Sequence, residues 1–320
     1  MAFDPVFNDK SVEASSATPV VARRRMSRFI RVLRDAPRHG LGSALRIPES
    51  FHVVELAPNY AVHNWVDDRV TPQEERAFIL TLATMAPFLA HASAPAADTA
   101  LESEVCVGSD QAECFLAAVV LDVPLISFYV GLWVNPIVRG TWSRLTLSGA
   151  VTKSRINLRN LSDLIHYETH EAWITCRRAD NISNMAQLWA DRSALFPNLV
   201  FCPTVESQLL RIASSDPHFH RVVVRLFALE KYFKTWSSGP FNPKAFAKCN
   251  PSSPQTLEHR EYGPRYRFTK PSGDEVICSW HLYLTPGAWR IYFSPDPTIR
   301  SGVIGHIGVK LPSVTYGLVG

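Results

Sequence analysis

The chain has 320 residues, of which 46% are hydrophobic and 19% are charged, so it can bury a large core and is not disordered throughout. Its length favours two domains, and its net charge is unevenly spread: residues 1–50 carry +4, residues 51–230 carry −6 and residues 231–320 carry +6. The six cysteines form no CxxC pair and lie mostly in apolar runs, which argues against a disulfide framework and favours a reducing compartment.

The N-terminal residues contain an early acid and no apolar signal segment, so we expect a cytoplasmic protein. One stretch, residues 115–138, is apolar enough to suggest a membrane span. Asp122, Pro124 and Asn135 interrupt it, and each would be costly in lipid. We therefore expect a buried helix followed by a buried strand there, and no contact with a membrane.

Two segments precede the first expected domain. Residues 1–19 are polar and rich in Ser and Ala, which predicts disorder. Residues 20–50 are expected to form a basic helical arm, in which arginines flank an apolar strip. The candidates for contacting a nucleic-acid backbone in this arm are Arg23, Arg24, Arg28 and Arg31. A helix that docks a partner, or a solvated helix that covers the acidic middle of the chain, would show the same pattern.

Residues 51–200 are expected to form a mixed α/β domain. A helix is predicted after Thr71, where apolar residues recur at helical spacing, and a second one over residues 115–121. A buried strand is predicted over residues 125–129, and two more strands are predicted between residues 143 and 158. No glycine-rich phosphate loop is present in this part of the sequence.

Residues 201–320 are expected to form a smaller α+β domain with a pair of helices followed by an antiparallel β-meander. The helices are predicted over residues 204–213 and 216–236. From residue 265 onward the apolar period changes to two, which indicates strands at about 265–269, 276–284, 288–293 and 302–309.

Strand parity divides the side chains of this meander between two faces. Leu282, Leu284 and Ile291 belong to an apolar face. The other face is predicted to carry His281, Tyr283, Arg290, Tyr292, His306, Lys310 and Arg267, with Arg265 close by. A one-sided antiparallel sheet exposes polar residues in any case, so an ordinary solvated face explains this pattern equally well.

This polar face holds the groups needed to bind and cut RNA without a metal. Arg and Lys neutralise phosphate, while Tyr and His stack on unpaired bases, so Arg265, Arg267 and Tyr283 are candidates for nucleic-acid binding. Cleavage requires a base, an acid and a cation. The candidates for these catalytic roles are His281, Arg290, Tyr292, His306 and Lys310.

No metal site and no cofactor are expected. His166 and His170 are four residues apart with carboxylates nearby, which is a zinc-binding spacing on a helix. Their order differs from the HExxH motif, and the sequence offers no evident third ligand.

Two stretches carry a resemblance to known proteins. The C-terminal motifs RFTKPSG (267–273), SWHL (279–282), WRIYF (289–293) and IGHIGVKL (304–311), together with NWVDD at 64–68, resemble a widespread group of uncharacterised bacterial proteins. That group occurs in mobile-element and phage-defence settings and has no agreed activity. The resemblance covers most of residues 50–315.

The helix pair and the basic meander with an RI-aromatic-F strand also look like the RelE/ParE toxin superfamily, over about residues 205–315. RNA-cutting members of that superfamily act on messenger RNA at the ribosome and are held in check by an antitoxin. Only Arg290, and Lys310 or His306, have counterparts in the superfamily pattern. His281 has no fixed counterpart, and some members do not cut RNA.

Two hypotheses therefore stand. In the first, the chain is a phage-defence or toxin-like protein whose C-terminal domain binds RNA or the ribosome and acts as a metal-independent endoribonuclease. In the second, it is a non-catalytic structural or docking subunit of a larger defence complex. An antitoxin would be the protein partner in the first case, and other subunits of the complex in the second.

Overall fold

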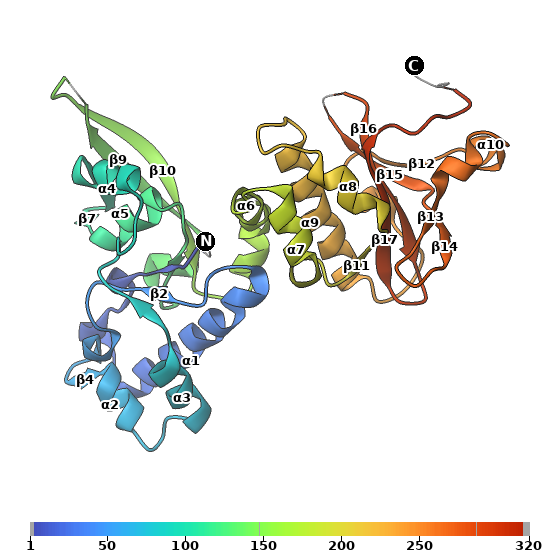
Figure 1. Cartoon of the computed structure of the whole chain (residues 1–320). Coiled ribbons are helices and arrows are strands. Elements are labelled where there is room, and N and C mark those ends of the chain that lie inside the picture. The colour runs from blue at the N-terminus through green and yellow to red at the C-terminus, as the bar shows by residue number, and fades with distance from the viewer. Residues whose placement is uncertain (1–2, 147, 286, 316–320) are drawn as a thin grey trace. The chain divides into compact units, whose positions relative to one another are not determined.

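The computed structural model describes residues 3–146, 148–285 and 287–315, and the chain divides into two compact units. The N-terminal unit comprises Met1–Ile174 and the C-terminal unit Thr175–Gly320, and each is described by itself (Figure 1). The boundary lies within helix α6 (His166–Asp180), so the predicted boundary at residue 200 is wrong. The reason is that Ile182, Leu188 and Phe196 belong to the core of the C-terminal unit.

The N-terminal unit is built on an eight-stranded sheet with the order β5-β2-β1-β8-β10-β9-β6-β7. The strands are β1 (Val6–Phe7), β2 (Leu45–Arg46), β5 (Thr84–Met85), β6 (Ser103–Val107), β7 (Asp110–Gln111), β8 (Leu125–Ile126), β9 (Ile137–Leu145) and β10 (Val151–Leu161). The strands from β5 to β10 in this order are parallel to one another, and the remaining pairs are antiparallel. The chain first moves outward from β1 through β2 to β5 and then crosses to β8 on the other side, so the topology switches between β1 and β8.

The predicted disorder of residues 1–19 is wrong for the described residues from Phe3 onward. Val6 and Phe7 are fully buried, and β1 pairs with β2 on one side and with β8 on the other. A strand of two residues is too short to show an apolar period in a Ser- and Ala-rich stretch. Burial between two neighbouring strands therefore overrides local composition here.

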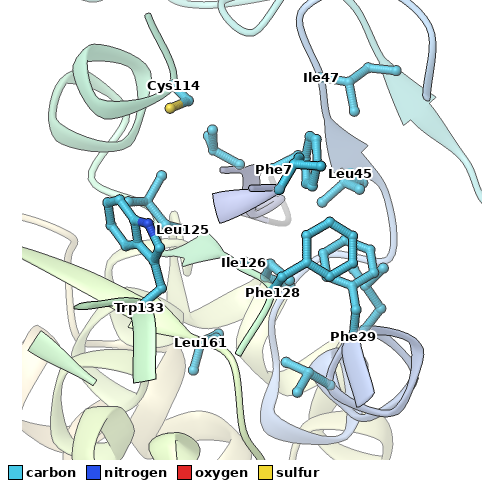
Figure 2. Close-up of a cluster of buried hydrophobic side chains, with 14 of the residues drawn as sticks. Phe7, Phe29, Leu45, Ile47, Cys114, Leu125, Ile126, Phe128, Trp133 and Leu161 are labelled. Atoms are coloured by element: carbon cyan, nitrogen blue, oxygen red, sulfur yellow. The ribbon is translucent and has the colours of Figure 1, made fainter. Parts of the chain in front are cut away.

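Helix α1 (Pro19–Asp35) is part of the core and not a separate arm, so the predicted arm of residues 20–50 is also corrected. Met26, Phe29 and Ile30 on its apolar strip are buried. The ring of Phe29 lies 5.7 Å from that of Phe7 and 4.9 Å from that of Phe128, between centroids, and Figure 2 shows these rings gathered beside Leu45. An isolated amphipathic helix would expose this apolar strip to water, but here the strip packs against the parallel strands and is buried.

Further helices flank this sheet: α2 (Val62–Asp67), α3 (Gln73–Thr81), α4 (Ala94–Leu101) and α5 (Glu113–Val120). A short antiparallel pair, β3 (Glu55–Ala57) and β4 (Tyr60–Ala61), precedes α2. The helices predicted after Thr71 and over residues 115–121 are thus confirmed, and the apolar stretch continues into strand β8. Among the described residues, no helix is long and apolar enough to cross a membrane.

The C-terminal unit contains a five-stranded sheet with the order β11-β17-β16-β15-β12. Its strands are β11 (Leu199–Phe201), β12 (Cys249–Pro251), β15 (Trp280–Leu284), β16 (Trp289–Asp296) and β17 (Ser301–Val309). The pair β11–β17 is parallel, and the others are antiparallel. The apolar face packs against helices α7 (Met185–Leu195), α8 (Thr204–Leu210) and α9 (Phe219–Thr235), and the predicted apolar residues Leu282, Leu284 and Ile291 lie in that core.

The predicted four-stranded meander is only partly correct. Strands β13 (Arg267–Thr269) and β14 (Glu275–Ile277) form a separate hairpin, which interrupts the strand predicted over residues 276–284. With helix α10 (Pro254–Glu258), this hairpin lies on the side of the sheet opposite to α7 and α9 (Figure 1). Tyr266, Cys278 and Tyr292 form a second small core there, so the polar face is covered in part. Considered as a whole, the chain is a mixed α/β protein.

Candidate active site

A cavity of about 180 Å³ opens where the polar face of the C-terminal sheet is left uncovered. Its lining residues are Asn250, Pro251, Ser252, Ser253, Thr256, Tyr266, His281, Tyr283, Tyr292, Lys310, Ser313 and Thr315. Four of the residues selected by strand parity therefore line one cavity. The lining contains hydroxyls, an amide, an imidazole and an ammonium group, but no carboxylate, so the cavity suits an anion.

His281 is held in the wall of the cavity by its position on the sheet. It lies opposite Tyr292 in the β15–β16 pair, with the two ring centroids 5.2 Å apart, and only 8% of the residue is exposed. Its Nδ1 atom is buried and has no hydrogen-bond partner among the described residues. Burial lowers the pKa of His281 to about 4, with further lowering by Arg290 and Lys310. The imidazole is therefore neutral at pH 7 and can accept a proton.

Arg290 lies opposite Tyr283 in the same strand pair, and its guanidinium carbon is 3.7 Å from the centroid of the Tyr283 ring. Its Nη1 donates to the carbonyl of Trp289 at 2.7 Å, whereas its Nε is buried without a partner in the described part of the chain. The residue is 8% exposed, and none of the ion pairs between described residues includes it. A buried cation without a carboxylate is costly, so this group indicates an anionic ligand.

Lys310 follows strand β17 and places a cation in the lining, whereas Arg290 is not one of the lining residues. Burial lowers the pKa of its ammonium group, and Arg290 lowers it further, so Lys310 gives up its proton more easily than a solvated lysine does.

Two tyrosine hydroxyls fasten the segment that carries Lys310. The hydroxyl of Tyr292 accepts from the backbone nitrogen of Leu311 at 3.0 Å, and that of Tyr266 donates to the carbonyl of Pro312 at 3.0 Å. Burial raises the pKa of both tyrosines, which therefore stay protonated at neutral pH. Their role at the cavity is to position groups and not to transfer protons.

His306 is not brought into the cavity. Its Nδ1 is 3.0 Å from Nε2 of Gln208, and its Nε2 is 3.1 Å from the carbonyl oxygen of Val309. Both ring nitrogens are therefore engaged, with Nε2 donating and Nδ1 accepting. His306 joins strand β17 to helix α8 through Gln208. Because both of its ring nitrogens are engaged, neither is free for the predicted proton transfer.

The predicted nucleic-acid contacts are dispersed. Arg265 and Arg267 are exposed, at or before the separate hairpin, and neither lines the cavity. In the N-terminal unit, Arg23 is bound to Asp68 with 2.6 Å between Nη1 and Oδ2, on the side of α1 that faces α2. The other three, Arg24, Arg28 and Arg31, line a hollow of that unit.

Several lining residues were missed at the sequence level. Residues 250–255 are rich in Pro, Ser and Asn, which predicts a loop, but Asn250 and Pro251 belong to the edge strand β12, opposite His281 and Trp280. Strand β12 has only three residues and one of them is a proline, so its sequence does not predict a strand. Its assignment as the edge strand depends on its pairing with β15. Tyr266 was likewise placed on a strand, whereas it ends a 3-10 turn and enters the cavity wall.

The histidines at zinc-like spacing, His166 and His170, are buried and bind backbone. Nδ1 of His166 is 3.1 Å from the carbonyl oxygen of Asn160, and Nε2 of His170 is 2.8 Å from that of Pro136. Burial lowers the pKa of both imidazoles. They fasten the start of α6 to the strands β9 and β10. Within the described ranges, no group of three or more His, Cys, Asp or Glu side chains is placed to hold a metal ion.

Comparisons with known proteins add no assignment: no protein-family model, no curated protein and no solved structure matches the chain.

Proposed function

We propose that the C-terminal unit binds RNA at this cavity and cleaves a phosphodiester bond with its own side chains. The observation that supports this most is Arg290, a buried arginine without an ion pair to any described residue, beside a cavity lining that carries the neutral His281 and no carboxylate. A phosphate group supplies a negative charge for the buried guanidinium of Arg290, and the imidazole supplies the base that a 2′-hydroxyl needs.

In the proposed reaction, the imidazole of His281 takes the proton of a 2′-hydroxyl, and the 2′-oxygen forms a bond to the adjacent phosphorus. The bond from phosphorus to the 5′-oxygen breaks, and the ammonium group of Lys310 gives a proton to that leaving oxygen. Arg290 stabilises the charge on the pentavalent phosphorus. The products are a 2′,3′-cyclic phosphate and a 5′-hydroxyl, so no water or other reactant is consumed.

The electrostatics of the cavity are consistent with this order of events. Burial, Arg290 and Lys310 lower the pKa of His281 in the free protein. A bound phosphate offsets the two positive charges, so the pKa of His281 rises and the imidazole becomes a stronger base once substrate is present. The lowered pKa of Lys310 favours proton donation in the same complex.

The resemblance to the RelE/ParE superfamily supports RNA as the substrate class, because Arg290 lies in the strand that carries the likeness. A toxin-like or phage-defence role in the cytoplasm, with the ribosome as the place of action and an antitoxin as a partner, belongs to the same proposal.

The test uses the purified full chain and a fluorescent RNA oligonucleotide, with and without EDTA. We expect a 2′,3′-cyclic phosphate product in both conditions, and no product from the same oligonucleotide with 2′-deoxy sugars. Arg290→Met should lower the rate by roughly 100-fold, because it removes the cation at the developing charge. Arg221→Met is the matched control, since Arg221 is exposed on α9 and makes the same change in net charge.

The proposal fails if wild-type protein leaves the RNA intact and binds it no better than Arg290→Met does. It also fails if the Arg290, His281 and Lys310 variants cleave as fast as wild type, since cleavage would then come from a contaminant or from another site.

A further inference from the structure

The N-terminal unit has the topology of sheets that bind ligands at the ends of their strands. Its parallel strands run in the order β5-β2-β1-β8-β10, and the direction of chain travel switches between β1 and β8. In open sheets of this kind, the loops after two such strands diverge and leave a crevice at the carboxyl ends, which is where ligands bind.

A hollow of about 490 Å³ lies at this edge. Its lining residues are Val21, Arg24, Arg25, Arg28, Arg31 and Tyr129. Tyr129 follows the end of β8, and the arginines come from α1, the helix that follows β1. Positions 24, 28 and 31 recur at helical spacing, so these side chains share one face of the helix. The volume is in the range of small-molecule sites.

Two of the arginines are held by acids that follow the same parallel strands. Arg28 forms an ion pair with Asp163, just after β10, and its guanidinium carbon lies 3.4 Å from the centroid of the Tyr129 ring. Arg25 donates to the carbonyl of Val12 at 3.1 Å and lies 3.9 Å from a carboxylate oxygen of Glu13, after β1. These contacts tie α1 to the ends of β1, β8 and β10.

The other two arginines remain uncompensated. Arg24 and Arg31 are exposed, and neither forms an ion pair with any described residue. They are seven residues apart, or about 10 Å along the helix axis, on either side of the fixed Arg28. The hollow therefore presents two exposed guanidinium groups on either side of Arg28, which is held by Asp163 and Tyr129, and this geometry suits an extended anion with two charged groups.

The segment between β1 and α1, residues 8–18, contains no glycine, so the backbone amides of a glycine-rich loop do not form a phosphate cradle here. Arginine side chains occupy the crevice instead. We propose that this hollow binds a diphosphate group, either free or as part of a nucleotide, with Arg24 and Arg31 closing on it. This proposal is independent of the RNA cleavage proposed for the other unit.

The test is isothermal titration of the full chain with pyrophosphate, ADP and ATP at low salt. We expect binding of at least one of them, and a roughly tenfold loss of affinity for each of Arg24→Ala and Arg31→Ala. Arg38→Ala is the matched control, because its side chain is 81% exposed and lies outside the lining. Equal affinity for pyrophosphate and ADP would identify the free diphosphate as sufficient, and tighter binding of ADP would identify a nucleotide.

The proposal is overturned if none of the three probes binds, or if Arg24→Ala, Arg31→Ala and Arg38→Ala bind equally well. Tight binding of single-stranded RNA without any binding of pyrophosphate, ADP or ATP would also overturn it. Arg24 and Arg31 are exposed, so circular dichroism should show that their variants fold as wild type does. Loss of this site should leave RNA cleavage by the C-terminal unit unchanged, which separates the two proposals.

Discussion

Replacing Arg290 with methionine should raise the pKa of His281. The His281 and Tyr283 ring centroids are 5.4 Å apart, and the guanidinium carbon of Arg290 is 3.7 Å from the Tyr283 centroid, so the two groups lie within about 9 Å of each other. At that distance and an effective dielectric constant of about 20, two unit charges interact by about 1.8 kcal/mol. The pKa of His281, about 4 in the wild type, should therefore rise by about one pH unit in Arg290→Met.

The measurement is a titration of the histidine Cε1 protons by NMR in protein with labelled histidines. His281→Gln assigns the signal, because it removes one histidine resonance. Arg221→Met is the control, since it removes one positive charge from an exposed position on α9, across the sheet from the cavity. A His281 that titrates near 6.5 in wild-type protein, or one that responds equally to both substitutions, would refute the electrostatic account of the cavity.

Two further predictions concern stability. The pKa of His281 is about 4 in the folded state and 6.5 in the unfolded state, so the unfolded state binds the extra proton between these pH values. The free energy of unfolding should thus fall by about 3 kcal/mol as the pH drops from 6.5 to 4. Urea titrations at the two pH values measure this fall, and in His281→Gln the fall should be smaller by the same amount. Phe7→Ala should cost about 3–5 kcal/mol because Phe7 is fully buried, whereas Leu101→Ala should change little because Leu101 is 87% exposed. Thermal unfolding checks this, and an unchanged melting temperature for Phe7→Ala would mean that β1 is not part of the folded core.

The polar face of the C-terminal sheet could be predicted because strand parity is a local rule. Once the register β15–β16 is drawn, Leu282 must oppose Ile291, and His281 must oppose Tyr292. Nothing local, however, states what covers each face. The hairpin β13–β14 and helix α10 cover part of the polar side, and this cover turns a solvated face into a cavity with the buried His281 in its wall.

The N-terminal sheet was largely hidden from sequence reasoning for a different reason. Several of its parallel strands, including β1 and β8, are only two residues long, which is too short for any periodicity. Their pairing joins residues more than a hundred positions apart, such as Val6 and Leu125. The sequence pattern shows the apolar strip of α1 but not the strands that pack against it, and therefore predicts a separate arm. The spacing of apolar residues predicts which face of α1 is buried, but only the tertiary structure shows which strands that face packs against.

The two cationic sites differ in a way that bears on what each can do. Arg24 and Arg31 are exposed, so water already solvates their charges and they cost the fold little. Arg290 is buried without an ion pair to any described residue, beside a histidine whose pKa is lowered first by burial and then by the charge of Arg290. Such an arrangement destabilises the folded protein, because a desolvated cation is compensated only partly by the Tyr283 ring and the Trp289 carbonyl. A solvated pair of arginines suits reversible binding of a mobile anion. A buried cation next to a neutral base gains most from a negative charge that develops beside it, as the charge on a phosphorane does, and this is why we propose the chemistry for the C-terminal unit.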